Sequence, residues 1–366
     1  MKHNIYATVF MSLITLISEA ESSTYVYNNE SIHIKTVAEA LKKTNLAFEF
    51  VDSLDKEDSK NLYIICDSFK ENPKNLPKHY IVYQSLNLTQ NTLTNDYLTT
   101  LSNSVAIWDY STENINQYKN ELCNYYYMPP QSPYVDPITL PCNLPISELA
   151  SYKELLIYSN QKNTDISSHL PALFCHAILQ NPKIIIELGV RGGESTKPLH
   201  KAAQRSNAQL IGVDIDPMWV KKSYNSMSNA ICIEMNDLDF KSYYTNSPFK
   251  NEKFDLIFID TSHEYTHTLQ EIILFTQFLS EEGTLVFHDS NVTPLENAGY
   301  IRLNGSQDFA PGNPRGVPQA IKEYFSIEFD EYSYVNTTFT SQEVTWHMTH
   351  YPFCNGLTII KKQTHN

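Results

Sequence analysis

The sequence predicts an α/β protein: a doubly wound, Rossmann-like parallel sheet in the C-terminal part, preceded by a second, smaller α/β domain. Three observations predict it. Short apolar runs rich in β-branched residues alternate with helical patterns from residue 184 onward. A glycine-bearing turn follows the first of these runs, at residues 189–193. A proline-rich stretch at 129–146 separates this part from an earlier region of similar alternation and reads as a linker.

Length and charge bound the function. A chain of 366 residues exceeds one typical hydrophobic core, so two domains are expected. The net charge of −14 argues against binding to nucleic acid, because no basic stripe is present to displace phosphate counterions. A small-molecule or glycan substrate suits this surface better. The sequence leaves a homo-oligomer open.

Residues 1–22 have the pattern of a signal peptide. Lys2 and His3 precede an apolar segment, residues 5–17, and small residues follow at 18–20. The apolar segment is short for a membrane span, so stable membrane insertion is not expected. This pattern favours export, to the periplasm or the medium. A cytoplasmic protein whose first strand or helix lies here is the alternative.

The smaller α/β domain is predicted over residues 23–128. An amphipathic helix is expected at 33–43, where Val37, Ala40 and Leu41 share a face. The other segments are apolar strands and polar helices in alternation, which is typical of a parallel sheet with crossover helices. The strands are expected at 25–27, 46–51, 61–66, 79–84 and 105–108, and the further helices at 95–101 and 113–122.

Residues 147–366 predict the second domain, and two helices, 147–159 and 168–179, lead into its first strand. Continuous apolar runs are typical of buried parallel strands, and the polar, periodic segments between them are typical of crossover helices. The strands are expected at 184–188, 209–214, 230–235, 254–260, 284–288 and 357–361, and the helices at 195–204, 217–226, 266–279 and 317–324.

A cofactor site is predicted at the first strand's carboxyl end. The strand ends at Glu187, Gly189 and Gly193 shape the turn, and Ser195 opens the next helix. Ligands of doubly wound sheets bind outside the carboxyl ends of the strands. We therefore assign these four residues to cofactor binding. A crossover turn without function is the alternative.

Residues at the ends of the next two strands indicate which class of cofactor binds. Asp214 ends the second strand, where a carboxylate can accept hydrogen bonds from a ribose diol. Asn236 or Asp237, after the third strand, would contact an adenine amino group. The negative charge of Glu187 disfavours a pyrophosphate. A cofactor with a ribose and a cation is therefore expected, which S-adenosylmethionine matches better than NAD.

A second cluster of polar residues follows the next two strands. Asp260 and Asp289 end neighbouring strands and are predicted to project into one crevice. Two carboxylates with an amide oxygen, for which Asn291 is the candidate, suit Mg²⁺. His263 is the candidate general base for a substrate hydroxyl. Helix caps and a structural histidine are the alternatives.

Other histidines and aromatic residues are weaker candidates. His288 is expected to point away from the crevice, because it alternates with Asp289 along a strand. The segment from Trp346 to Tyr351 either forms a lid over the substrate or packs against the sheet. For Trp346 we favour packing.

In these residues the second domain resembles the class I S-adenosylmethionine-dependent methyltransferases, over about residues 165–362. More narrowly it is similar to the family of macrolide-sugar O-methyltransferases and cephalosporin-tailoring enzymes. The motifs that carry the resemblance are ELGVRGGEST at 187–196, GVDID at 212–216, FIDTSHEY at 258–265, HDSN at 288–291, RGV at 315–317 and NGL at 355–357.

The resemblance implies cofactor contacts at Glu187, Gly189 and Asp214, and a divalent metal held by Asp260 and Asp289. His263 matches the position of the base in sugar-methylating relatives. Metal-binding relatives often carry another acid directly after the position of Asp289. This chain has Ser290 there, which puts the metal in question.

The first domain resembles the N-terminal half of a two-domain glycosyltransferase, on residues 80–84 and 105–115. The half that would bind the donor sugar is absent, so a glycan-binding or structural role is expected rather than glycosyl transfer.

The expected function is methyl transfer from S-adenosylmethionine to a hydroxyl of a sugar or other small molecule, with His263 and Asp260 as catalytic residues. Two alternatives remain from the sequence. One is a catalytically silent module that binds glycans or a partner protein. The other is a metal-dependent hydrolase that acts without the cofactor.

Overall fold

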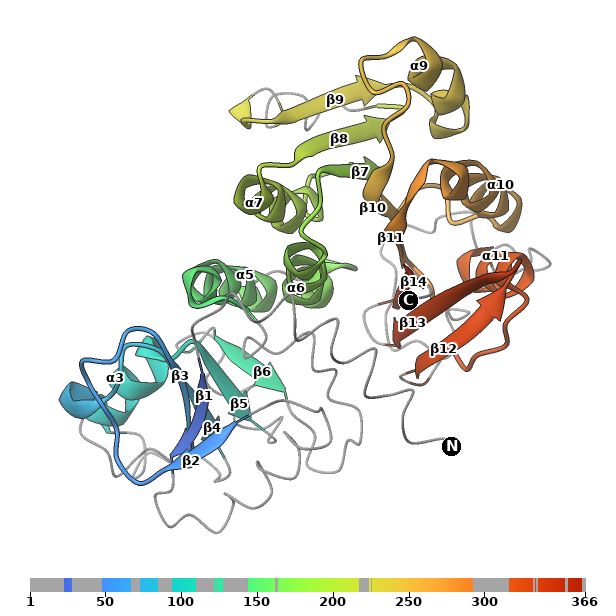
Figure 1. Ribbon diagram of the computed structural model, residues 1–366. Coiled ribbons are helices and arrows are strands. Elements are labelled where there is room, and N and C mark those ends of the chain that lie inside the picture. The colour runs from blue at the N-terminus through green and yellow to red at the C-terminus, as the bar shows by residue number, and fades with distance from the viewer. Residues whose placement is uncertain are drawn as a thin grey trace. The chain divides into compact units, whose positions relative to one another are not determined.

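The computed structural model describes residues 23–27, 48–66, 73–84, 94–109, 122, 124–127, 144–161, 164–216, 224, 226–291, 316–331, 333, 335–352 and 355–363 (Figure 1). The chain divides into two compact units, Met1–Asn163 and Thr164–Asn366. Segment 1–22, helix 33–43 and most of the linker 129–146 lie outside the described residues, as do most of helices 113–122 and 217–226. What was predicted for them stays a prediction.

The first unit contains a six-stranded parallel sheet in the order β2-β1-β3-β4-β5-β6. Its strands match the five predicted ones, and β6 adds a sixth. The strands are β1 (Thr24–Tyr27), β2 (Glu49–Val51), β3 (Leu62–Cys66), β4 (Tyr80–Gln84), β5 (Ala106–Asp109) and β6 (Tyr125–Tyr127). The helices are η2 (Pro73–Asn75), α3 (Asn95–Asn103), η5 (Ile146–Glu148) and α5 (Leu149–Gln161).

Local chemistry explains these elements. All five residues of β3 are buried, as expected of a central parallel strand that is covered on both faces. Helix α3 begins after Thr94, whose side chain accepts a hydrogen bond from the backbone N–H of Tyr97 and so caps the helix.

The second unit contains an eight-stranded sheet in the order β12-β13-β14-β11-β10-β7-β8-β9. Its strands are β7 (Ile184–Leu188), β8 (Gln209–Asp214), β9 (Ala230–Glu234), β10 (Phe254–Ile259), β11 (Leu279–His288), β12 (Val335–Ser341), β13 (Val344–Tyr351) and β14 (Leu357–Gln363). Its helices are η6 (Ser167–His169), α6 (Leu170–Gln180), α7 (Thr196–Ser206), η8 (Asp237–Asp239), α9 (Phe240–Asn246), α10 (Tyr265–Phe275), η9 (Thr276–Phe278) and α11 (Gly316–Phe325).

The strand order confirms the doubly wound fold. The five parallel strands run β9-β8-β7-β10-β11, which is the order 3-2-1-4-5 (Figure 1). The order reverses between β7 and β10, where Glu187 lies opposite Phe258 and Leu188 opposite Ile259. Ligands bind at such a switch point. The residues that follow β7 and β10 therefore meet at the position that this fold uses for a cofactor.

The core of the second unit packs around this sheet. All five residues of β7 are buried, including Glu187. Phe240, Phe254, Phe275 and Phe278 pack their rings against one another, with centroids 5.5–6.1 Å apart. This aromatic cluster joins α9 and α10 to the sheet. Among the described residues, no helix has the length and apolar character that a membrane crossing requires.

The hairpin β12–β13 decides between the two interpretations of the segment from Trp346 to Tyr351, a lid or packing against the sheet. Residues 344–351 form a strand of the sheet rather than a lid, and Trp346, 3% exposed, packs in the core as favoured. The turn consists of Gln342 and Glu343, both with positive φ (51° and 63°). Two-residue hairpins of this kind usually carry Asn-Gly or Asp-Gly. The sequence lacks that signal, so the hairpin was not predicted.

Candidate functional site

The turn after β7 lies against the end of β10. Gly189 has a φ of +79°, and a Cβ at this position would lie 1.9 Å from the carbonyl oxygen of Asp260. Gly193 has a φ of +80°, and its N–H donates to the carbonyl of Val190 at 2.8 Å. Only glycine fits both the backbone angle and the close approach at position 189. The predicted turn therefore exists and adjoins Asp260.

Glu187 anchors this turn to helix α7. Its carboxylate is fully buried and accepts hydrogen bonds from Ser195 Oγ (2.6 Å), Thr196 Oγ1 (2.7 Å) and Tyr224 Oη (2.5 Å). Burial raises the pKa of Glu187 to about 7, although the three hydroxyls act in the opposite direction. Glu187 and Ser195 hold each other in this structure. Their contact with a cofactor stays a prediction.

Sequence reasoning missed Thr196 and Tyr224 as partners of Glu187. The signal for Tyr224 is Gly212, where a Cβ would lie 2.6 Å from the tyrosine hydroxyl. Glycine in a strand often marks such a close approach. Because Gly212 has no side chain, the tyrosine ring can pass close to the backbone of β8 and reach Glu187.

Asp214 holds the other side of the turn. Its Oδ2 accepts from the backbone N–H groups of Val190 (2.8 Å) and Arg191 (2.9 Å), and its Oδ1 accepts from Asp216 (2.8 Å). A carboxylate offers about four acceptor positions. One position on Oδ1 is therefore left for a ribose hydroxyl. Ile215, which sequence reasoning missed, is 73% exposed beside it and offers apolar surface to a base.

The two candidates for the adenine contact differ in their surroundings. Asn236 is exposed, and its side chain accepts from the N–H of Leu238 at the start of η8. Asp237 is buried, and its Oδ2 lies 3.0 Å from Nε2 of His267. Either contact stays a prediction.

The second predicted cluster is assembled as expected and gains a member. Nε2 of His263 lies 3.1 Å from Asp260 Oδ1 and 2.8 Å from Asp289 Oδ2. Nδ1 of His288 lies 3.3 Å from Asp260 Oδ1 and 3.6 Å from Asp289 Oδ2. We call these four residues the Asp260 cluster.

The expectation that His288 points away from the crevice is wrong. Alternation holds only inside a strand, and β11 ends at His288. Asp289 has a φ of +54°, in the left-handed region, which returns its side chain to the same crevice. His263 is also left-handed, with a φ of +60°. Such backbone angles are uncommon outside glycine and concentrate at functional sites.

Charge balances within the Asp260 cluster. Nε2 of His288 lies 3.1 Å from the carbonyl oxygen of Asp165, while its Nδ1 faces Asp260. Both partners only accept hydrogen bonds, so both ring nitrogens carry protons and His288 is an imidazolium. Although burial lowers the pKa of His288, the Asp260 and Asp289 carboxylates outweigh it and hold that pKa well above the ordinary value.

The same reasoning applies to His263 and the carboxylates. Burial lowers the pKa of His263, but Asp289 and Asp260 raise it to about 10. Burial raises the pKa of Asp260, but His288 and His263 bring it to about 2. In this arrangement His263 holds a proton at neutral pH. Its role as a general base stays a prediction that requires this proton to leave first.

The Asp260 cluster, as arranged, does not fit Mg²⁺. This ion prefers oxygen ligands in an octahedron, and two imidazole nitrogens face the carboxylates where such an ion would lie. Asn291 donates its side-chain N–H to the carbonyl of Pro352. Its Oδ1 and the Oγ of Ser290 are buried without a partner among the described residues. These two oxygens do not make the cluster suitable for Mg²⁺, because the two imidazoles already neutralise the charge of the two carboxylates.

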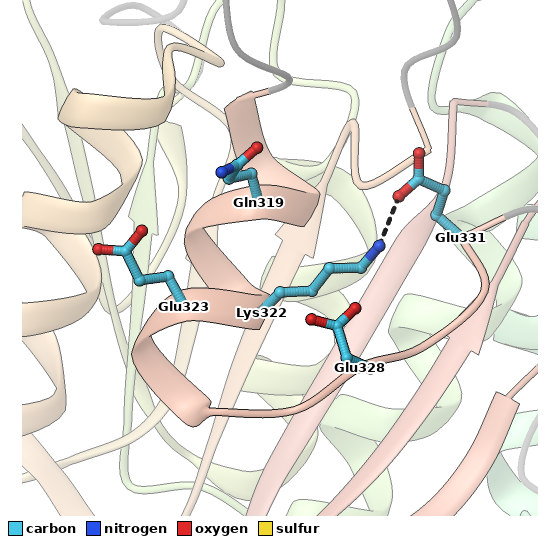
Figure 2. A pocket seen from close by; sticks show the side chains of 5 residues that line it. All are labelled: Gln319, Lys322, Glu323, Glu328 and Glu331. Atoms are coloured by element: carbon cyan, nitrogen blue, oxygen red, sulfur yellow. Dashed lines mark hydrogen bonds and ion pairs between the residues drawn. The ribbon is translucent and has the colours of Figure 1, made fainter.

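A pocket of about 360 Å³ lies elsewhere, on α11 and the loop after it. Figure 2 shows its side chains around Lys322, whose Nζ pairs with Glu331 at 3.0 Å. The other lining residues are Gln319, Glu323 and Glu328. None of the predicted site residues lines this pocket. They lie instead at the carboxyl ends of β7, β8, β9, β10 and β11.

Comparisons with known proteins address the same region. Residues 186–290 match a family described as a methyltransferase domain. No curated protein matches the chain. These residues run from the middle of β7 to just past β11, and they contain Glu187, Asp214, Asp260 and Asp289.

Solved structures resemble part of the chain. One is an SAH-bound methyltransferase from Podospora anserina, with 17% identity, 58% of this chain and 88% of that chain covered, and a TM-score of 0.36. Another is the O-methyltransferase of Streptomyces achromogenes involved in tomaymycin synthesis, in complex with SAM. It has 12% identity and a TM-score of 0.38, and the match covers 63% of this chain and 92% of that chain. A third is an O-methyltransferase from Bacillus cereus in complex with SAH. It has 16% identity and a TM-score of 0.36, and the match covers 58% of this chain and 91% of that chain. Residues 186–290 of this chain thus match a methyltransferase domain, and in the structure they lie on a doubly wound sheet.

Proposed function

We propose that the second unit transfers a methyl group from S-adenosylmethionine to a hydroxyl of a sugar or other small molecule. One observation carries the proposal. The turn next to Glu187 and Asp214 lies against the backbone of Asp260, so the proposed cofactor site and the proposed acceptor site would share one edge of the sheet. The match of residues 186–290 to a methyltransferase domain supports it.

The cofactor, when bound, supplies an electrophilic methyl group on a sulfonium sulfur. The chain's task is then to hold this group and bring the acceptor oxygen in line with it. Asp214 would accept from a ribose hydroxyl through its remaining position on Oδ1. Ile215 would cover one face of the base. The turn positions both, because Asp214 binds its backbone N–H groups.

The Asp260 cluster would hold the acceptor hydroxyl. Asp260 is 22% exposed, against 1% for Asp289, so Asp260 is the carboxylate that an acceptor can reach. His263, 17% exposed and 3.1 Å from Asp260, would take the hydroxyl proton once its own proton has left. The deprotonated oxygen would then bond to the methyl carbon as the carbon–sulfur bond of the cofactor breaks. The products would be a methyl ether and S-adenosylhomocysteine.

A sugar is our proposed acceptor class, on the resemblance of motifs 258–265 and 288–291 to sugar-methylating enzymes. We also propose that the first unit is a glycan-binding or structural domain, on the resemblance of residues 80–84 and 105–115 to half of a glycosyltransferase. The acidic net charge supports a neutral acceptor rather than a nucleic acid.

Two measurements test the proposal. Calorimetry of the full chain with S-adenosylmethionine should show binding, which Asp214→Ala weakens at least tenfold. Labelled methyl transfer to sugar-containing acceptors should be abolished by Asp260→Ala, while this variant still binds the cofactor. Absence of cofactor binding by the folded wild-type chain would overturn the proposal. Turnover that survives Asp260→Ala would remove Asp260 from the site.

A further inference from the structure

A second cluster of ionisable side chains shares no residue with the Asp260 cluster and takes no step in the proposed methyl transfer, although one of its members, Asp237, is a candidate for the adenine contact. It consists of Asp237 in η8 and of His267 and Glu271 in α10. His267 and Glu271 are four residues apart, so they share one face of the helix. Asp237 follows β9 and approaches this face. We call these three residues the His267 cluster.

The geometry points to a divalent transition-metal site, and we propose that the His267 cluster binds Zn²⁺ through one imidazole nitrogen and two carboxylates. Its ligand atoms all lie within 4.8 Å of one another. Bonds of about 2.0–2.1 Å in a tetrahedron separate neighbouring ligand atoms by about 3.3 Å. Nε2 of His267 lies 3.0 Å from Asp237 Oδ2 and 3.8 Å from Glu271 Oε1, which brackets this spacing.

Charge separates this cluster from the Asp260 cluster. There, two carboxylates face two imidazoles. Here, two carboxylates face one imidazole, and no lysine or arginine among the described residues forms an ion pair with them. Glu271 is fully buried, and its Oε2 has no hydrogen-bond partner among the described residues. A buried carboxylate in this state needs a cation or a proton.

The surroundings suit a metal ion. Thr261 Oγ1 donates to Glu271 Oε1 at 2.8 Å and so orients that carboxylate, as partners of metal ligands do. The His267 side chain is 20% exposed, which leaves a path for the ion and for a water ligand. Imidazole nitrogen suits Zn²⁺, whereas Mg²⁺ prefers oxygen alone.

The alternative to the cation is a proton on Glu271. Burial, followed by the charge of Asp237, raises the pKa of Glu271 well above its ordinary value. A shared proton would then hold the two carboxylates together. The two states make opposite predictions for metal binding, and the inference does not depend on the proposed methyl transfer.

The test is calorimetric titration of Zn²⁺ into the full chain after chelator treatment and dialysis. Wild type should bind one Zn²⁺ that raises the midpoint of thermal unfolding. Glu271→Gln keeps the side-chain shape and should weaken this binding at least tenfold. Asp289→Asn is the matched control, because it removes one carboxylate from the other cluster, and it should leave the Zn²⁺ affinity unchanged.

His267→Gln is the second variant, in case Glu271→Gln does not fold, because this partly exposed position tolerates change. It too should weaken Zn²⁺ binding at least tenfold. Absence of Zn²⁺ binding by wild type, or equal affinity in the folded His267 and Glu271 variants, would overturn the inference in favour of the shared proton. Loss of binding in the folded Asp289 variant would overturn it as well, because the ion would then belong to the Asp260 cluster.

Discussion

Nε2 of His263 lies 2.8 Å from Oδ2 of Asp289, and both residues have left-handed backbone. The two come from different loops, one after β10 and one after β11. Gly316, at the start of α11, packs so closely on the first loop that a Cβ would lie 1.5 Å from the carbonyl oxygen of His263. The ion pair thus joins two strained loops that a helix end confines.

This ion pair predicts the titration of His263. Asp289→Asn removes the nearest negative charge, and burial then lowers the His263 pKa from about 10 toward neutrality. We expect the His263 ring signals to change between pH 6 and 9 in the variant and to stay constant there in wild type. Histidine NMR titration checks this. We also expect the variant to lose about 3 kcal/mol of stability, because one partner of a buried pair is removed.

Gly189→Ala should disrupt the cofactor turn. The new Cβ would lie 1.9 Å from the Asp260 carbonyl oxygen in a left-handed conformation, at a cost of roughly 1–3 kcal/mol. We expect S-adenosylmethionine binding to weaken at least tenfold in calorimetry. Gly192→Ala is the control, since its Cβ would meet nothing closer than 3.6 Å. Equal binding by both variants would show that the turn does not form the cofactor site.

Glu187 predicts a pH dependence of stability. Its folded pKa, about 7, exceeds the ordinary carboxyl value of 4.5, so the folded state binds the proton more tightly. The resulting stabilisation is complete below pH 4.5 and is lost as the pH rises through 7. Urea unfolding of wild type and Glu187→Gln should therefore show a difference that declines across this window. A difference that rises with pH would contradict the assignment.

For His350 we expect the opposite dependence of folding stability on pH. Its Nε2 lies 2.9 Å from the Glu331 carbonyl oxygen and its Nδ1 lies 2.7 Å from the Thr358 hydroxyl, which suits a neutral ring. Burial lowers its pKa to about 4 from an ordinary 6.5. Its stabilisation is present above pH 6.5 and is lost as the pH falls through 4, by about 3 kcal/mol. His350→Gln should lose less stability over this range, as measured by thermal unfolding.

Added Mg²⁺ is not expected to raise methyl transfer. Two imidazoles already neutralise Asp260 and Asp289, so the ion would have to displace both. Turnover of chelator-treated protein should be the same with and without millimolar Mg²⁺. A rise in turnover that Asp289→Asn abolishes would show that the histidines yield to the metal.

Patterns that act within a few residues were enough to predict much of the fold. The bounds of β7 and β8 agree with the prediction because in each an apolar run leads to an acidic residue at the last or next-to-last position of the strand. The hairpin β12–β13 was missed because Gln342 and Glu343 adopt positive φ without a glycine or asparagine to signal it. There the pairing of the strands within the sheet overrides local preference.

The sequence by itself determined which acidic residues lie at or next to the carboxyl ends of the strands, and parallel strands bring those ends to one edge of the sheet. Glu187, Asp214, Asp260 and Asp289 were predictable for that reason. Only the tertiary structure decided what these carboxylates contact. Three hydroxyls enclose Glu187, backbone N–H groups occupy most of Asp214, and His288 turns into the crevice beside Asp260. These partners come from other loops, and their direction depends on backbone angles that neighbouring elements impose, which no local pattern encodes.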